Sequence, residues 1–262
     1  MKARPCQAAR KDREKEKDFQ WTSSQTDVGC LKTNQQGGRE MARQVGLEIW
    51  GDLGCFTRPD HGKAERMTAP IITPSAARGV SESVYYKPTE FRFQIDKIYI
   101  LNPVNYIALR RNEVKEKGAY GRPIDPTVSE LGPKGRTQRQ SICLWKPRYK
   151  IVATINPYDG RSPDPLYEQF RSRAESGQCF QRPCMGCREF VAFFEWSDPE
   201  VVPVAKEEIN MDCGLLLYDV FDLRVRSDKK VAVSPSFFHA KIVKNLLEVP
   251  PYESKLVMKV NE

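Results

Sequence analysis

Histidine is scarce in this chain, because His61 and His239 are the two imidazoles among 262 residues. Histidine is the side chain that most readily exchanges a proton near neutral pH, so this scarcity restricts general acid–base chemistry. The sequence also lacks the motifs GxxxxGKS or GxxxxGKT, HExxH and GxSxG. Their absence argues against an ATPase, a zinc protease and an α/β-hydrolase.

Long apolar runs are missing as well. No stretch of about 18 apolar residues occurs, so we expect neither a membrane span nor a membrane partner. The N-terminus has no apolar segment of the kind that secretion signals carry. These features predict a cytoplasmic protein whose eight cysteines are reduced thiols.

Charge is unbalanced toward basic residues, with 42 Lys and Arg against 34 Asp and Glu and a formal net charge of +8. Such an excess favours a polyanionic partner, with RNA or DNA ahead of an anionic lipid. The alternative is an excess charge that only improves solubility.

Composition divides the chain into three parts. Residues 1–40 contain few apolar residues without a period, which predicts a disordered basic extension. Residues 41–196 carry the periodic apolar pattern of a folded domain. Residues 197–262 hold shorter apolar runs, which predict a small C-terminal β region and a tail.

The apolar periods predict the secondary structure of the folded part. Strands are expected at 45–51, 91–101, 149–155 and 190–196, and helices at 73–86 and 164–176. Thr73 suits an N-cap and Pro74 the first helical position. The order β, α, β, insert, β, α, β predicts an α+β fold, namely a ferredoxin-like, RNA-recognition-type antiparallel sheet with two helices on one face.

The insert at 110–141 is polar, rich in glycine and proline, and too long for a simple turn. Guanidinium groups bind phosphates bidentately and stack on bases, so its cations predict RNA contact. A solvated loop is the alternative. The cations of the insert are Arg110, Arg111, Lys115, Lys117, Arg122, Lys134, Arg136 and Arg139.

The end of the first expected helix carries Tyr85, Tyr86 and Lys87. Neighbouring tyrosines at a helix end point in different directions, so at most one is expected to face the core. The other is a candidate for stacking on a base or donating to a phosphate. The alternative is that both pack beneath a loop.

Cys184 and Cys187 form a CxxC pair. A zinc site would need four ligands, and no second pair of this kind occurs. A redox CxxC would begin a helix, whereas a strand is expected here. We therefore expect structural thiols, no metal site and no other cofactor.

A sharper interpretation comes from particular strings of residues that occur in one order. They are Trp50–Asp52, Cys55–Pro59, Thr73–Gly79, Lys87–Pro88, Leu101–Pro103, Arg110–Val114, and Gly177–Phe180 followed by Gly186–Phe190. Together they resemble the type I-C Cas-five family of CRISPR proteins from about residue 44 to 196, with a looser match beyond.

The resemblance implies a ferredoxin-like RNA-binding fold with a protruding hairpin, which corresponds to the insert at 110–141. Family members hold the 5′ handle of CRISPR RNA at one end of the Cascade complex, beside Cas-seven and Cas-eight subunits, and meet target DNA only through that complex. Type I-C members also cut precursor CRISPR RNA without a metal, because the ribose 2′-OH attacks the adjacent phosphate.

The resemblance also implies site residues. The family's catalytic tyrosine corresponds to Tyr85, whereas its Lys-His pair is replaced by Pro165 and Leu166. Arg161, Arg171 and Arg173 are candidates to supply the missing lysine charge, but no residue nearby replaces the imidazole. Two functions follow: an endoribonuclease that keeps its product, or a Cascade subunit that binds RNA without cutting it. A nucleic-acid-binding protein outside CRISPR is a third hypothesis.

The RNA-binding residues expected from this combined interpretation are all basic. They are Lys87, Arg110, Arg111, Lys134, Arg136, Arg139 and Arg188.

Overall fold

A computed structural model describes most of the chain. The described residues are 43–60, 65–114, 136–158, 160–226 and 233–260. The extension predicted at 1–40 therefore lies outside the described residues, as do His61 and Lys134.

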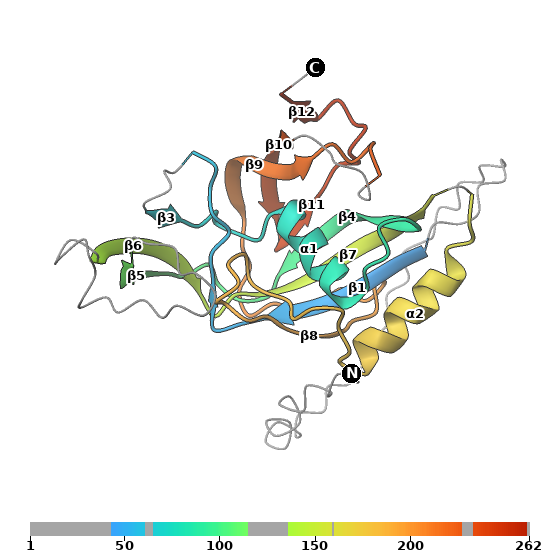
Figure 1. Ribbon diagram of the computed structural model, residues 1–262, viewed down its shortest axis with the longest axis horizontal. Coiled ribbons are helices and arrows are strands. Elements are labelled where there is room, and N and C mark those ends of the chain that lie inside the picture. Colours follow the sequence, from blue (N-terminus) through green and yellow to red (C-terminus); the bar gives the residue numbers. More distant parts are fainter. Residues whose placement is uncertain (1–42, 61–64, 115–135, 159, 227–232, 261–262) are drawn as a thin grey trace.

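The centre of the fold is an antiparallel sheet (Figure 1). It contains β1 (Arg43–Trp50), β4 (Phe91–Ile100), β7 (Arg148–Pro157) and β8 (Phe193–Trp196), which lie side by side in the order β4, β7, β1, β8. Three of these strands match the predicted ranges closely. The fourth begins three residues later than predicted, because the backbone before it closes a turn in which the Phe190 N–H donates to the Cys187 carbonyl oxygen at 3.0 Å.

Two helices cover one face of this sheet. Helix α1 (Pro74–Val84) begins as predicted, with the Thr73 hydroxyl accepting a hydrogen bond from the Ala76 N–H at 3.2 Å. Helix α2 (Asp164–Glu175) buries Phe170 against Phe93 of β4. No helix in the described part of the chain is long and apolar enough to cross a membrane.

The first helix ends two residues earlier than predicted. Tyr85 has φ −141° and ψ 110°, so the backbone is already extended at the position that follows Val84. Tyr85 and Tyr86 therefore lie beyond the helix rather than on its last turn.

The basic insert is a β-hairpin at its base. Strands β5 (Tyr106–Val114) and β6 (Arg136–Trp145) pair along their whole length, and short strands β2 (Leu53–Gly54) and β3 (Arg66–Met67) complete a second sheet with β6. The hairpin agrees with the resemblance, whereas composition alone favours a loop. Figure 1 shows it at the end of the molecule away from α2.

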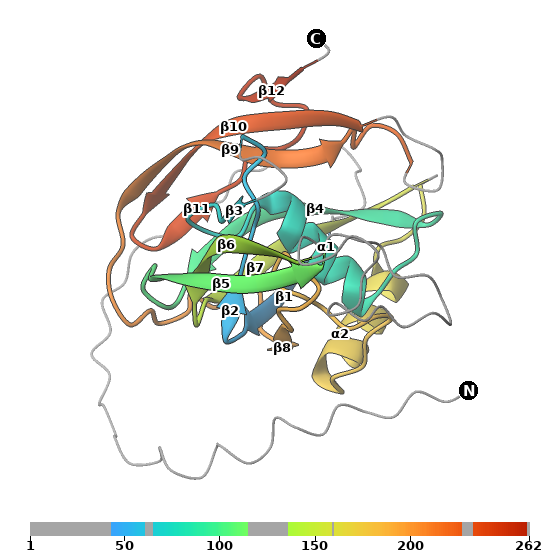
Figure 2. The same cartoon turned by 60° about the vertical axis from the view of Figure 1, so that its left-hand side comes forward.

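The C-terminal region is larger than the small appendage expected. Strands β9 (Met211–Phe221) and β10 (Val233–Val243) form a long antiparallel pair, followed by β11 (Leu246–Glu248) and β12 (Val257–Lys259). Strand β11 pairs with β4, so these strands continue the main sheet to eight strands (Figure 2). The described fold is thus a sheet-rich α+β structure with two helices, and its sheets are antiparallel apart from the short parallel pair of β3 with β6.

Candidate functional site

Tyr85 lies where the ends of the two helices meet. Its backbone N–H still donates to the Ser81 carbonyl oxygen at 3.2 Å, while its ring leaves the helix and stacks on Phe91 with centroids 5.5 Å apart. The Arg173 guanidinium, from the last turn of α2, covers the same ring at 5.9 Å. The ring therefore contacts both an aromatic side chain and a cation.

Arg173 also fixes the end of α1. Its Nε donates to the Val84 carbonyl oxygen at 2.9 Å, which satisfies one of the carbonyls that a helix end leaves without an intrahelical partner. The same guanidinium therefore positions both the backbone before Tyr85 and the tyrosine ring.

Tyr85 is half-buried, and this burial raises the pKa of its phenol. Lys87 and Arg173 oppose the rise and Glu90 adds to it. The phenol is therefore neutral at pH 7, which makes it a donor of a hydrogen bond or a proton rather than a base.

Cations surround this tyrosine at the surface. Lys87 forms an ion pair with Glu90 at 3.1 Å, and Arg161 lies 3.9 Å from the same carboxylate. Arg171 instead pairs with Glu175 at 2.8 Å on the exposed side of α2. Of the three arginines considered as replacements for a lysine, the structure brings Arg173 onto Tyr85 and Arg161 to the neighbouring Glu90.

Pro165 and Leu166 occupy the first turn of α2. Leu166 is 7% exposed and packs in the core, whereas Pro165 is exposed. Arg173 lies more than two turns further along, about 12 Å at 1.5 Å per residue. The described contacts of Tyr85 with α2 therefore come from the opposite end of the helix.

The remaining tyrosine, Tyr86, faces outward. Its ring lies 5.5 Å from that of Phe180, and both are exposed. This supports the expectation that at most one of the two tyrosines faces the core. Phe180 was not identified from the sequence as a site residue, and neither was Glu90.

The two faces of the hairpin differ in chemistry. Arg111 forms an ion pair with Glu189 at 2.9 Å, and Arg139 forms one with Glu113 at 3.2 Å. The Arg111 guanidinium also lies over the Phe190 ring at 6.0 Å. These two cations, both half-buried, thus serve contacts within the protein.

Arg110 points to the other, solvent-exposed face. It lies opposite Gln140, and the next exposed pair is Asn112 with Gln138. Arg136 pairs through its backbone with Val114. The open face of the described hairpin therefore combines one cation with three amides, which can donate to and accept from nucleic acid.

Residues 177–192, which we term the connector, join α2 to β8 and contact both regions. Near their start, Phe180 meets Tyr86; further on, Glu189 meets Arg111. Arg182 and Arg188 are exposed along this path. The connector thus links the surroundings of Tyr85 to the base of the hairpin.

The CxxC segment is a tight turn within the connector. The Cys55 N–H donates to the Met185 carbonyl oxygen at 2.9 Å, and the Cys187 thiol contacts the Cys55 carbonyl oxygen at 3.6 Å. Gly186 has φ +83°, and a Cβ there would lie 2.1 Å from that carbonyl oxygen. The hydrogen bond to Cys55 and burial raise the pKa of Cys187, so its thiol stays protonated.

His239 lies away from Tyr85. It is exposed on β10, with Nε2 3.4 Å from the Asp212 carboxylate. The described surroundings of Tyr85 therefore supply a phenol, cations and a carboxylate, and no imidazole.

Comparisons with known proteins agree with these features. The family model for the CRISPR-associated protein Cas5, in its Cas5d form, matches residues 45–247. A protein of Mannheimia succiniciproducens named CRISPR pre-crRNA endoribonuclease Cas5d is 36% identical over 83% of this chain and 99% of its own length. A protein of the same name from Thermus thermophilus is 35% identical over 85% of this chain and 97% of its own length.

A solved structure described as a CRISPR-associated protein has the same fold. It superposes with a TM-score of 0.57 over 84% of this chain and 99% of its own, at 15% identity. The family model covers most of the chain and both curated relatives match over nearly their whole lengths. The chain belongs to the Cas5 family of CRISPR-associated proteins, in its type I-C (Cas5d) branch.

Proposed function

We propose that this protein is an endoribonuclease that cuts precursor CRISPR RNA and then holds the 5′ handle of its product within a type I-C Cascade complex in the cytoplasm. The observation that carries the proposal is the placement of the Tyr85 ring against both Phe91 and the Arg173 guanidinium, with Lys87 two residues further along the chain. The names of the two curated relatives support the same reaction.

The fold assignment that goes with this function is a ferredoxin-like unit. Its support is the order β4, β7, β1, β8 with antiparallel neighbours, together with α1 and α2 in the connections. In this assignment β5 and β6 form the protruding hairpin of the family, and the strands beyond β8 extend the sheet.

The proposed reaction uses the RNA's own 2′-OH. The 2′-oxygen forms a bond to the adjacent phosphorus, the bond from phosphorus to the 5′-oxygen breaks, and the 2′-OH proton leaves to solvent. Tyr85 donates a proton to the departing 5′-oxygen and regains one from solvent. Arg173 and Lys87 stabilise the negative charge that builds up on the phosphate oxygens.

The proposed RNA path follows exposed cations from this centre to the hairpin. Lys87 and Arg188 contact the backbone near Tyr85 and along the connector, and Arg110 contacts it on the hairpin face. Arg136 and Lys134, the second of which lies outside the described residues, are the further proposed RNA contacts. Cas-seven and Cas-eight subunits are the proposed protein partners, and target DNA is met through the assembled complex.

A second candidate function is a handle-binding subunit that does not cut. Pro165 and Leu166 favour it, because neither side chain can transfer a proton or stabilise a phosphorane. In this second function the RNA would bind along the same path, but no cleavage would take place at Tyr85.

Incubation of the purified protein with its own repeat RNA in excess EDTA distinguishes the two functions. We expect one discrete cut on a denaturing gel, since no step above requires a divalent metal. An RNA that stays intact but shifts on a native gel would establish the binding-only subunit instead. An RNA that neither shifts nor is cut would remove both functions.

Arg110→Ala is expected to weaken binding of the repeat and to lower the slope of log affinity against log salt by about 0.7 to 0.9, the loss of one phosphate contact. Arg111→Ala is the matched control on the next residue of β5. Its side chain serves Glu189 and Phe190, so the slope should stay at the parental value. Filter-binding titrations at several salt concentrations measure both, and equal slopes for Arg110→Ala and the parent would place the RNA off this face.

A further inference from the structure

An exposed aromatic pair lies directly beside the reaction centre and has no role in the mechanism above. The rings of Tyr86 and Phe180 are 5.5 Å apart at an interplanar angle of 32°, and the two residues are 38% and 63% exposed. Water covers much of both rings, although burying an aromatic side chain is strongly favourable. Their exposure at this place needs an explanation.

Backbone hydrogen bonds join the two chain segments that carry the pair. The Phe180 and Gln181 N–H groups both donate to the Ser83 carbonyl oxygen, at 2.8 and 3.1 Å, in the last turn of α1. The Gln178 N–H donates to the Arg173 carbonyl oxygen at 2.9 Å. The turns that follow the two helices are thus joined, so the two rings are positioned before any ligand arrives, which lowers the entropic cost of binding.

The charges around the pair fit a nucleic acid. Lys87 follows Tyr86 in the chain, Arg182 is exposed two residues after Phe180, and Arg173 joins the two turns. Proteins that bind single-stranded RNA combine aromatic rings, on which bases stack, with cations that contact the backbone. A purely apolar protein partner would not require cations on this side.

We propose that Tyr86 and Phe180 form a stacking platform for one unpaired base of the RNA, belonging to a nucleotide next to the phosphate that Tyr85 serves. The platform rests on the proposed function, because it reads the same RNA. The Phe180 N–H lies 3.3 Å from the carbonyl oxygen of Val84, the residue before Tyr85, so the pair lies next to the end of α1 that carries Tyr85. The platform selects an unpaired nucleotide at this position and so contributes to the choice of cleavage site.

The experiment pairs protein variants with repeat RNAs that each carry one abasic nucleotide near the cut. For the parental protein, we expect one abasic position to reduce affinity about tenfold, which is ~1.4 kcal/mol and within the range for stacking one base. Phe180→Ala should bind the intact repeat about tenfold more weakly and show no further loss at that position. Phe180→Trp should restore both the affinity and the sensitivity to the abasic site.

Leu256→Ala, which shortens another highly exposed apolar side chain on the C-terminal region, is the matched control and should behave as the parent. Thermal unfolding of each variant verifies that the fold is intact. If the parental protein binds and cuts the repeat while Phe180→Ala does so equally well, the platform is wrong and the proposed function stands. The platform is also wrong if, at every abasic position, the affinity lost through Phe180→Ala and the affinity lost through the abasic nucleotide combine as independent factors. If the parental protein neither binds nor cuts, the proposed function fails first.

Discussion

Tyr85→Phe is expected to slow cleavage of the repeat RNA by at least about 100-fold, within the range of general acid–base contributions, while RNA affinity stays within a few-fold of the parent. The substitution removes one hydroxyl and keeps the ring. Stacking on Phe91 and under Arg173 therefore persists. Single-turnover cleavage with protein in excess measures the chemical step apart from binding and product release.

Tyr167→Phe is the matched control, because it removes the same atom from a tyrosine whose ring packs on Trp196, and it should cut at nearly the parental rate. Cleavage by Tyr85→Phe at the parental rate would instead make Tyr85 a packing residue. The reaction would then need another group, and the positive charge of Arg173 and Lys87 alone would remain to stabilise the phosphate.

The pH dependence of cleavage adds a readout that a packing role would not produce. The raised pKa of Tyr85 keeps the phenol neutral up to pH 9, and loss of the 2′-OH proton then controls the rate. We expect the parental rate to rise steadily from pH 6 to 9. A bell-shaped profile centred near pH 6.5 would indicate an imidazole instead.

The sequence predicts the local elements of this fold well where period and capping agree. Thr73 and Pro74 mark the start of α1 because a side-chain acceptor and a fixed φ both suit that position. The strict alternation of Phe91, Phe93 and Ile95 marks β4, because every second side chain enters the core. Each of these two signals, the capping residues and the alternation, is contained in a few consecutive residues, so it can be recognised without knowing the fold.

Features that depend on contacts between residues far apart in the chain are harder to predict from the sequence. The strands of the hairpin contain Arg110, Arg111 and Arg139, so composition indicates a loop, yet pairing of β5 with β6 satisfies their backbone groups. The contact of Arg173 with Tyr85 joins two helices that are far apart in sequence, and no local pattern indicates it. The C-terminal strands are underestimated for a similar reason, since Leu247 becomes buried through pairing with β4.

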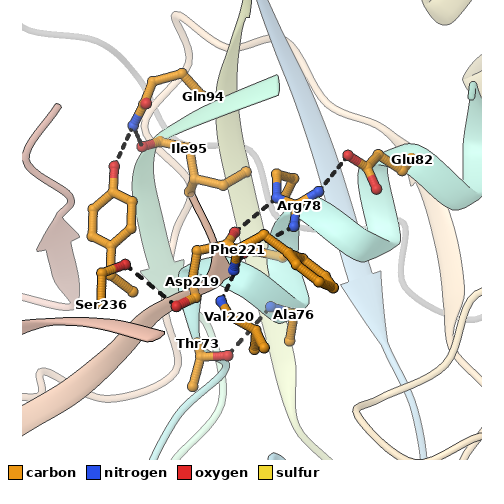
Figure 3. Close-up of polar contacts among 12 residues, drawn as sticks. Thr73, Ala76, Arg78, Glu82, Gln94, Ile95, Asp219, Val220, Phe221 and Ser236 are labelled. Carbon is orange, nitrogen blue, oxygen red and sulfur yellow. Dashed lines mark hydrogen bonds and ion pairs between the residues drawn. The ribbon is translucent and has the colours of Figure 1, made fainter. Parts of the chain in front are cut away.

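A second large effect is expected at the buried ion pair that joins α1 to β9 (Figure 3). Arg78 donates to both carboxylate oxygens of Asp219, at 2.8 and 3.1 Å, and also pairs with Glu82 one turn along α1. The Val220 and Phe221 N–H groups donate to the same carboxylate at 2.7 and 3.1 Å. The side chains of Arg78 and Asp219 are 13% and 2% exposed, so water cannot replace these partners.

Asp219→Ala is expected to lower the free energy of unfolding by about 3–5 kcal/mol, because it leaves Arg78 buried without its main partner. Glu175→Ala is the matched control: it breaks the exposed pair with Arg171 and should cost about 0.3–0.5 kcal/mol. Urea denaturation measures both values. A loss below about 1 kcal/mol for Asp219→Ala would mean that solvent, or Glu82 alone, stabilises the charge of Arg78 without Asp219.

The double variant Arg78→Leu with Asp219→Leu is expected to be more stable than Asp219→Ala, since replacing both members of a buried pair removes the stranded charge. Its cleavage rate then tests whether the pair also positions Tyr85. The end of α1 is held independently, by Arg173 at the Val84 carbonyl and by Phe180 at the Ser83 carbonyl. We therefore expect the folded double variant to cut within a few-fold of the parent. A rate lowered as far as that of Tyr85→Phe would show instead that the attachment of α1 to β9 sets the position of the phenol.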